Sequence, residues 1–278
     1  MRKTGEALLI LVSLELALHL LASALPIHAY AREAILALAF LSPFLLLRRT
    51  AVWRSLYRPL PLLPADRRRG AAAGLLLLPP MVLSVTLVGM ATERLLPLPA
   101  ISASPAEVIL FSVLLAPLTE ELFVRGTILP LLLPHSRASA LLVSSLLFGL
   151  MHLNVAQLPY AVTAGLFLGA AALCSDSLLV PIAMHLASNL LQFLLSLLSG
   201  SVAEETVLKA IVLSALAILS LPALWYAVAR GLRSYRGAHG RMRTQLKVAL
   251  RTLACTLPPA ALPHTAALLI LLGSQGGS

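Results

Sequence analysis

Three short clusters of polar side chains interrupt otherwise apolar stretches of this sequence. They supply two carboxylates, one guanidinium, two imidazoles and one carboxamide, from Glu120, Glu121, Arg125, His152, His185 and Asn189. An ionisable side chain at the centre of a membrane helix costs roughly 2.5–3.5 kcal/mol, so those found there are candidates for function. The clusters therefore predict one polar catalytic centre buried in a membrane.

The first cluster reads Glu-Glu-Leu-Phe-Val-Arg. Residues four apart share one face of a helix, so Arg125 is expected to neutralise Glu121 and, through its planar fork, to hold it in a bidentate pair. Glu120 points about 100° away and is left to act as a general base on water. The alternative is a structural Arg–Glu pair that lets the end of a helix reach the membrane interface.

The other two clusters place Phe148 with His152, and His185 with Asn189, on shared helix faces. Histidine can polarise a bond, shuttle a proton or bind a metal, and an asparagine amide can donate to a developing oxyanion. The alternative is that these side chains only join helices by hydrogen bonds. Together, a water between Glu120 and His152, with His185 and Asn189 across from it, would have the parts for amide hydrolysis.

The composition sets the fold class. Of 278 residues, 59% are hydrophobic and only 12% are charged, whereas a soluble domain has about 25% charged residues. The apolar runs are about 20 residues long, which indicates helices and not the short alternating strands of a barrel. We predict an all-α polytopic membrane protein with about eight transmembrane helices, at 6–25, 32–47, 71–92, 107–131, 138–155, 158–174, 178–199 and 206–229.

Two segments leave alternatives open. The stretch 252–273 is apolar but contains three prolines, so it could be a ninth span, a re-entrant segment or a surface helix. The N-terminus resembles a signal peptide that ends at Ala29-Tyr30-Ala31. Because Glu6, Glu15 and His19 interrupt its apolar run, we expect an uncleaved first helix instead.

The basic residues predict the orientation. A net charge of +10 could indicate nucleic-acid binding, but the basic residues lie between the apolar runs, as the positive-inside rule requires. With the N-terminus inside and eight spans, 18 of the 21 Lys and Arg residues face the cytoplasm. We therefore expect no nucleic-acid partner. The Leu-, Ala- and Arg-rich composition suggests a multi-pass protein of a bacterial cytoplasmic membrane.

We divide the chain into three parts. Residues 1–104 hold the first three helices and a basic cytoplasmic loop at 48–70. Residues 105–200 hold helices four to seven and all six candidate site residues. Residues 201–278 hold the eighth helix, a basic segment and the stretch 252–273.

The three clusters, in this order, resemble the motifs of the CPBP family of intramembrane proteases, which includes CAAX prenyl endopeptidases and bacteriocin-processing enzymes and is also called the Abi family. Its pattern is Glu-Glu-x-x-x-Arg, then Phe-x-x-x-His, then His-x-x-x-Asn or Asp. Every position is met between residues 120 and 189.

The resemblance implies an eight-helix CAAX-protease-like bundle and endopeptidase activity on a membrane-associated peptide or protein. It implies that Glu120 activates water with help from His152, and that His185 and Asn189 stabilise the oxyanion. Glu121 and Arg125 would shape the site. The substrate could be a C-terminal membrane anchor, a leader peptide or a CAAX-like C-terminus.

The cofactor stays open at this point, because members of the family have been described both as metalloproteases and as metal-free glutamate proteases. His-Glu-x-x-His, the helical zinc signature, is missing from this sequence. Glu120, His152 and His185 could still supply three ligands to a divalent metal such as zinc. We expect no tightly held metal.

Two other classes of function compete with the peptidase. One is a catalytically silent immunity or scaffold protein on the same fold, which would not need both histidines and Asn189. The other is a proton-coupled transporter, because intramembrane Glu, His and Arg also form ion pathways. Transporters often show internal repeats, and we find none in this sequence.

Overall fold

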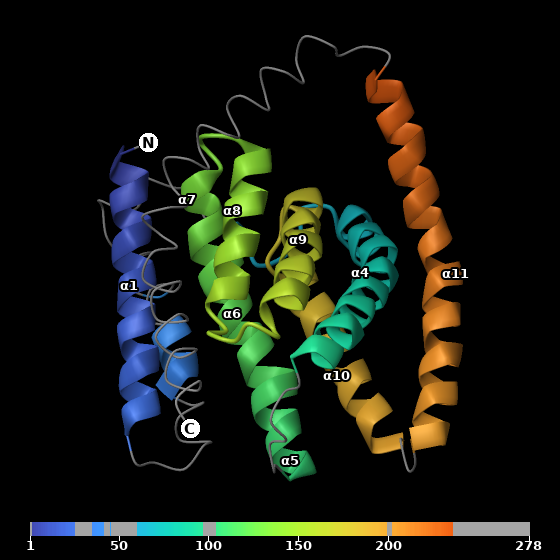
Figure 1. Ribbon diagram of the computed structural model, residues 1–278. Helices are drawn as coiled ribbons and strands as arrows, with labels where there is room; N and C mark the ends of the chain where they lie inside the picture. Colours follow the sequence, from blue (N-terminus) through green and yellow to red (C-terminus); the bar gives the residue numbers. More distant parts are fainter. Residues whose placement is uncertain are drawn as a thin grey trace.

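The computed structural model describes residues 2–25, 35–41, 45, 60–96, 104–198 and 202–235. Within these ranges all regular secondary structure is helical and no strand is present (Figure 1). The predicted fold class, an all-α polytopic membrane protein, is confirmed.

The described residues form six helices of 14 residues or more and one composite helix. The long helices are α1 (Arg2–Ala24), α4 (Arg67–Leu95), α8 (Arg137–Leu150), α9 (Leu158–Ser175), α10 (Leu179–Leu198) and α11 (Val202–Tyr235). The composite helix runs through α5 (Pro105–Glu107), the π-helical η1 (Val108–Leu115), α6 (Ala116–Phe123), the π-helical η2 (Val124–Ile128) and α7 (Leu129–Leu132). It holds the first polar cluster in its middle.

Four helical segments among the described residues are long and apolar enough to cross a membrane. They are Arg67–Glu93, Leu158–Ser175, Leu179–Leu198 and Leu208–Trp225. The predicted count of about eight spans is not confirmed. The stretch 252–273, the alternative cleavage site at 29–31 and half of the span expected at 32–47 lie outside the described residues.

Local side chains set where several helices begin. The Asp66 carboxylate accepts hydrogen bonds from the backbone N–H groups of Arg68 and Arg69 and so caps α4. Ser104 and Glu107 form a reciprocal capping box at the start of the composite helix. Both devices satisfy N–H groups that have no partner inside the helix.

The span expected at 138–155 is shorter in the structure, because α8 ends at Leu150. A helix of 14 residues is only about 21 Å long at the α-helical rise, less than the bilayer core. The Asn154 side chain accepts from the N–H groups of Ala156 and Gln157 and stabilises a turn there. Just before it, Leu153 adopts a left-handed conformation with φ of 49°.

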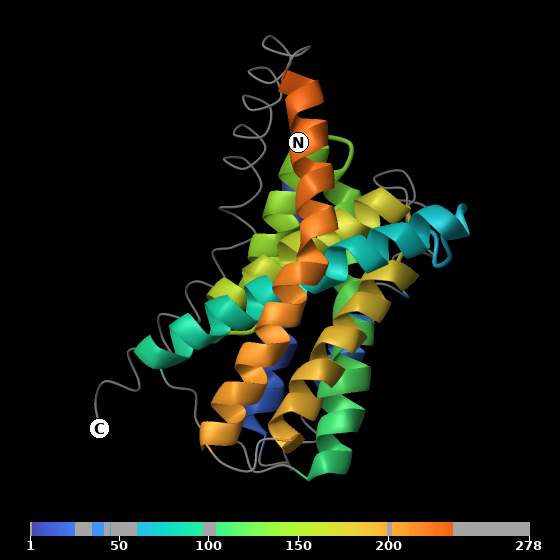
Figure 2. The ribbon, with the colours of Figure 1, turned by 90° about the vertical axis from the view of Figure 1, so that its right-hand side faces the viewer.

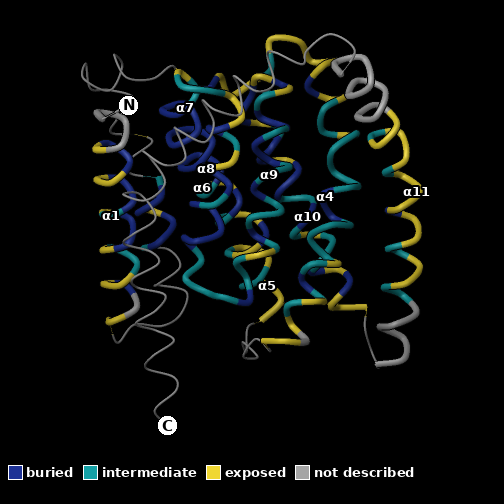
Figure 3. The backbone as a smooth tube through the Cα atoms, turned by 45° about the horizontal axis from the view of Figure 1, so that its top comes forward, coloured by how far each residue is buried: buried dark blue, intermediate teal, exposed yellow. Residues whose placement is uncertain are grey.

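The buried core lies around the composite helix. Fully buried side chains concentrate on α6, η2, α7 and α8, whereas α11 exposes mostly apolar side chains (Figure 3). α4 packs between α9 and α11 and crosses α11 at a steep angle (Figures 1 and 2). The polar cluster on α6 is therefore enclosed by helices, while the apolar surface of α11 suits contact with lipid.

α8 and α9 approach closely at Gly165. A Cβ atom at this position would lie 3.0 Å from Ser145 Cα and 3.3 Å from the Ser145 carbonyl oxygen. Small residues let helix backbones come this near in membrane proteins. The contact brings the Gly165 carbonyl into the core, next to the first polar cluster.

Candidate active site

Glu120 and Glu121 face different surroundings, as their helical spacing predicts. Glu121 is fully buried among neighbouring helices, whereas Glu120 is half-buried and lines a cavity. Both sit on α6, between two stretches of π-helix in which backbone hydrogen bonds reach five residues back, such as Ala116 N–H to the Phe111 carbonyl. Such bulges are frequent at functional sites.

Glu121 is the centre of a buried ionic cluster. Its Oε1 accepts from Arg125 Nη1 at 2.9 Å and from His185 Nδ1 at 3.1 Å. Glu121 and Arg125 have no exposed side-chain surface. A paired buried charge is tolerated, but the loss of one partner leaves an uncompensated charge that costs about 3–5 kcal/mol. The cluster therefore holds α6 against α10.

The guanidinium of Arg125 links three elements. Nη1 donates to Glu121, while Nη2 donates to the Gly165 carbonyl at 2.8 Å. The guanidinium carbon lies 4.7 Å from the centre of the Phe148 ring, within the range of a cation–π contact. The expected bidentate pair with Glu121 is wrong, because the second arm of the fork is used by α9.

His152 lies in the turn after α8 and not on the helix expected at 138–155. Its backbone N–H bonds to the Gly149 carbonyl, and its Nδ1 lies 2.8 Å from the Phe148 carbonyl oxygen. Because a carbonyl only accepts, Nδ1 must be the donor, so Nε2 of the neutral ring has a free lone pair. The ring is thus fixed in the tautomer that can accept a proton.

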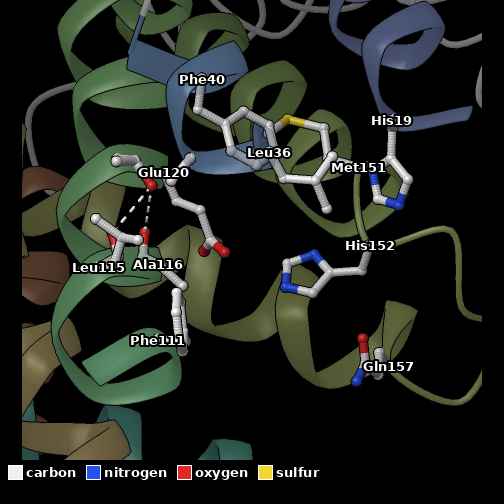
Figure 4. Close-up of a pocket in the computed structure, with 12 residues that line it drawn as sticks. His19, Leu36, Phe40, Phe111, Leu115, Ala116, Glu120, Met151, His152 and Gln157 are labelled. Carbon is white, nitrogen blue, oxygen red and sulfur yellow. Dashed lines mark hydrogen bonds between the residues drawn. The ribbon is translucent and has the colours of Figure 1, made fainter. Parts of the chain in front are cut away.

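A cavity of about 310 Å³ brings Glu120 and His152 together (Figure 4). The Glu120 carboxylate points toward the His152 ring, and the His19 ring lies on the opposite side of His152 from Glu120. Most of the remaining lining is apolar, from Leu36, Ala37, Phe40, Phe111, Leu115, Ala116 and Met151, with Thr119 and Gln157 as polar members. The cavity therefore combines a carboxylate and two imidazoles with apolar side chains.

His185 and Asn189 do not line this cavity. His185 donates to Glu121, and its ring meets the Phe148 ring edge-on with 5.8 Å between ring centres. Phe148 makes a similar contact with His152 at 5.1 Å. The expected arrangement, with His185 and Asn189 across a water from Glu120 and His152, is therefore not the one found.

Asn189 completes the backbone of the composite helix. In the π-helical register of η1, residue 117 would donate to the Ser112 carbonyl, but Pro117 has no N–H group. The amide of Asn189 donates to that carbonyl instead, at 2.8 Å. The side chain thereby joins α10 to the helix that presents Glu120.

The structure adds a site residue that sequence reasoning missed. His19 of α1 lines the cavity together with Glu120 and His152. A signal was present, because His19 and Glu15 are four residues apart in an apolar run, the same pattern that singled out Glu121 and Arg125. That pattern shows a shared helix face but cannot show which other helix the face meets.

The three candidate metal ligands do not come together on one face of the cavity. Glu120 and His152 line it, while His185 is bonded to the buried Glu121. In the part of the chain that the structure describes, no group of three His, Cys, Asp or Glu side chains has the spacing of a metal site. The arrangement of Glu120, His152 and His185 found here does not fit a three-ligand zinc site.

Comparison with known proteins identifies the class of this segment. Residues 102–191 match the model of the family described as Type II CAAX prenyl endopeptidase, Rce1-like. The matched segment contains all three polar clusters, so the predicted resemblance to the CPBP and CAAX protease family is confirmed. The searches of curated proteins and of solved structures each found no match.

Proposed function

We propose that this protein is an intramembrane endopeptidase that hydrolyses a peptide bond of a membrane-associated substrate. One observation carries the proposal: Glu120 and His152, which both belong to the segment that matches the Rce1-like family, line the same cavity. The family match supports a peptidase. The four helices long and apolar enough to cross a membrane support a substrate that is itself associated with the membrane.

In the proposed reaction, a water in the cavity is the nucleophile. The Glu120 carboxylate takes one proton from the water as the water oxygen adds to the carbonyl carbon of the substrate. The other O–H of the water donates a hydrogen bond to Nε2 of His152. Two positioned acceptors fix the direction of attack and raise the reactivity of the water. The C–N bond then breaks, leaving a new carboxyl group and an amine.

Glu121, Arg125 and His185 act in this proposal as positioning residues. Their buried cluster fixes α6 relative to α9 and α10, so that the neighbouring Glu120 faces the cavity. Asn189 serves the same end through the Ser112 carbonyl. These residues are needed for activity because a small displacement of Glu120 would misplace the water, and such displacements cost rate steeply.

The proposed substrate class is a peptide segment held at the membrane by its own anchor. The apolar wall around Phe40, Phe111 and Met151 favours an apolar segment next to the scissile bond. C-terminal anchors, leader peptides and CAAX-like C-termini all satisfy this requirement. The identity of the cleaved proteins distinguishes these three classes of substrate.

Mapping of protein termini tests the proposal without a known substrate. Membrane and secreted fractions are compared between cells with the native protein and cells with Glu120→Ala at an equal protein level. We expect new N- and C-termini that occur only with Glu120, and their sequences name the substrates and the cut site. Identical termini in both strains would overturn the proposal and favour a catalytically silent immunity or scaffold protein.

A further inference from the structure

α1 brings a second carboxylate–imidazole pair to the cavity. Glu15 and His19 lie one helical turn apart, with 3.6 Å between Glu15 Oε1 and His19 Nδ1. Glu15 is only 1% exposed, whereas His19 is partly exposed and lines the cavity that Glu120 and His152 share (Figure 4). A buried carboxylate beside a histidine that faces a cavity resembles the pairing in which a carboxylate orients a catalytic imidazole.

The position of this pair is fixed by packing. Leu8, Leu11 and Val12 of α1 belong to the same buried cluster as Phe123 and Val124 of the composite helix. Glu15 follows on the same side of α1, one turn beyond Leu11. α1 lies outside the segment 102–191 that matches the family model, so the pair is not part of the three motifs.

The Nδ1 atoms of the two histidines in the cavity face different acceptors. His152 donates through Nδ1 to the Phe148 carbonyl, which leaves a lone pair on Nε2 to receive a hydrogen bond from water. His19 has its Nδ1 toward a carboxylate instead, as in triads where a carboxylate orients an imidazole that transfers a proton. Such contacts are often long before substrate binds and shorten during the reaction.

We propose that His19 is the general acid of the reaction and that Glu15 is its positioning residue. This inference rests on the proposed function. In this step His19 acts as the imidazolium, with Nδ1–H toward Glu15 and Nε2–H toward the leaving nitrogen. As the C–N bond of the tetrahedral intermediate breaks, the electron pair goes to nitrogen and Nε2–H of His19 gives that nitrogen its proton. Glu120 holds the proton taken from water, and its return to Nε2 of His19 through solvent restores both groups. The sum is one peptide bond and one water converted to a carboxyl group and an amine.

The test compares two leaving groups. The probes are a fluorogenic peptide that spans a cut site mapped by Glu120-dependent termini, and the same sequence with a thioester at the scissile bond. An amine leaves only after it is protonated, whereas a thiol with a pKa of about 8.5 leaves as the thiolate. We expect His19→Ala to lower kcat for the peptide about 100-fold and for the thioester less than about threefold. Glu15→Gln should show the same selectivity with a smaller effect.

Three results decide the matter. Equal losses on both probes, or no loss on the peptide, would overturn the role of His19 while leaving the proposed function in place. Thioester and peptide cleavage that survives Glu120→Ala would instead overturn the proposed function itself. Leu20→Ala, at an exposed neighbour on α1, is the matched control and should leave both rates unchanged.

A second variant at position 19 keeps the test decisive if His19→Ala does not fold. Melting temperatures in detergent are measured for each protein, and if His19→Ala unfolds, His19→Gln is assayed in its place with the same expected selectivity. Free imidazole should restore peptide cleavage by His19→Ala, because it can enter the vacated space and donate a proton. A lack of rescue together with equal losses on both probes would contradict the proposal.

Discussion

Two adjacent glutamates with the same side chain have opposite surroundings in this protein. Glu121 is buried in an ionic cluster with Arg125 and His185, while Glu120 faces a cavity that it shares with His152. The difference follows from one step of about 100° around α6. At this scale the chemistry is divided between a residue that reacts and a residue that holds the helix in place.

Arg125→Lys should lower activity at least tenfold and reduce the free energy of unfolding by roughly 1–3 kcal/mol. A lysine ammonium cannot reach both Glu121 and the Gly165 carbonyl in the geometry of the fork, so one buried acceptor is left unsatisfied. Peptide cleavage and thermal unfolding in detergent check both parts. Arg137→Lys, at an exposed arginine, is the matched control. Wild-type activity in Arg125→Lys would contradict the fork's role.

Sequence spacing predicted part of this site, and its physical limit is clear. The contact between Glu121 and Arg125 lies within one helix, so the four-residue spacing is enough to find it. The contact between Arg125 and Gly165 joins residues 40 apart and depends on how α9 packs. For the same reason the spacing could not show that the second arm of Arg125 leaves Glu121.

At the scale of elements, the link between α10 and the composite helix gives a prediction about Asn189. Asn189→Ala should reduce activity, because the Ser112 carbonyl loses its donor. The free energy of unfolding should fall by about 0.5–1.5 kcal/mol, the net contribution of a typical hydrogen bond. Pro117→Ala added to this variant should restore much of both, because residue 117 then has an N–H that can bond to Ser112. Unfolding curves and cleavage rates of the single and double variants measure this.

The opposite outcome would assign Asn189 a different role. If Pro117→Ala restores stability to Asn189→Ala but leaves cleavage fully impaired, the amide acts on the substrate, as the motif resemblance implied. Pro117→Ala alone serves as the control, and it should retain cleavage because Asn189 is still present.

The contact between α8 and α9 predicts that Gly165→Ala is destabilising. Its Cβ would lie 3.0 Å from Ser145 Cα, which is backbone and can move only with its helix. We expect a loss of about 1–3 kcal/mol and reduced cleavage, because the Gly165 carbonyl that holds Arg125 shifts. Gly89→Ala is the matched control, with 3.8 Å to the nearest Tyr160 atom. Gly165→Ala as stable as Gly89→Ala would refute the close approach.

The lengths of the apolar runs predicted which segments are helices better than they predicted where those helices end. The runs at 71–92, 158–174 and 178–199 are helices α4, α9 and α10 with boundaries shifted by a few residues. The run expected at 138–155 ends at Leu150, because Asn154 binds the backbone beyond it and because His152 occupies the Phe148 carbonyl. Hydropathy reports burial in lipid and is insensitive to such competing hydrogen bonds.

At the scale of the whole molecule, charge distribution predicts which side of the membrane each end of α4 faces. The basic residues after Asp66 should lie in the cytoplasm and Glu93 on the opposite side. Single-cysteine variants Arg68→Cys and Glu93→Cys, made with Cys174→Ser and Cys255→Ser, report this through a membrane-impermeant maleimide. We expect labelling of position 93 in intact spheroplasts and of position 68 only after permeabilisation. The reverse pattern would invert the orientation, and labelling of both from one side would exclude α4 as a span.

The way the helices pack together in the whole molecule was the hardest feature to predict from the sequence. The all-α class and the CAAX-protease resemblance could be predicted from composition and three motifs, because both depend on local patterns. Which clusters share a cavity could not, since it depends on the packing of α1, α6 and α8. His19 therefore joins Glu120 and His152, whereas His185 and Asn189 are bonded elsewhere.

The most direct test of the account is the cleavage rate of Glu120→Gln beside that of Glu121→Gln, each measured with its melting temperature on a peptide that spans a mapped cut site. We predict that Glu120→Gln melts like the wild type and cleaves at least about 100-fold more slowly, while Glu121→Gln loses stability because Arg125 keeps an unpaired charge. Wild-type cleavage by folded Glu120→Gln would contradict the assignment of Glu120 as the base that activates water.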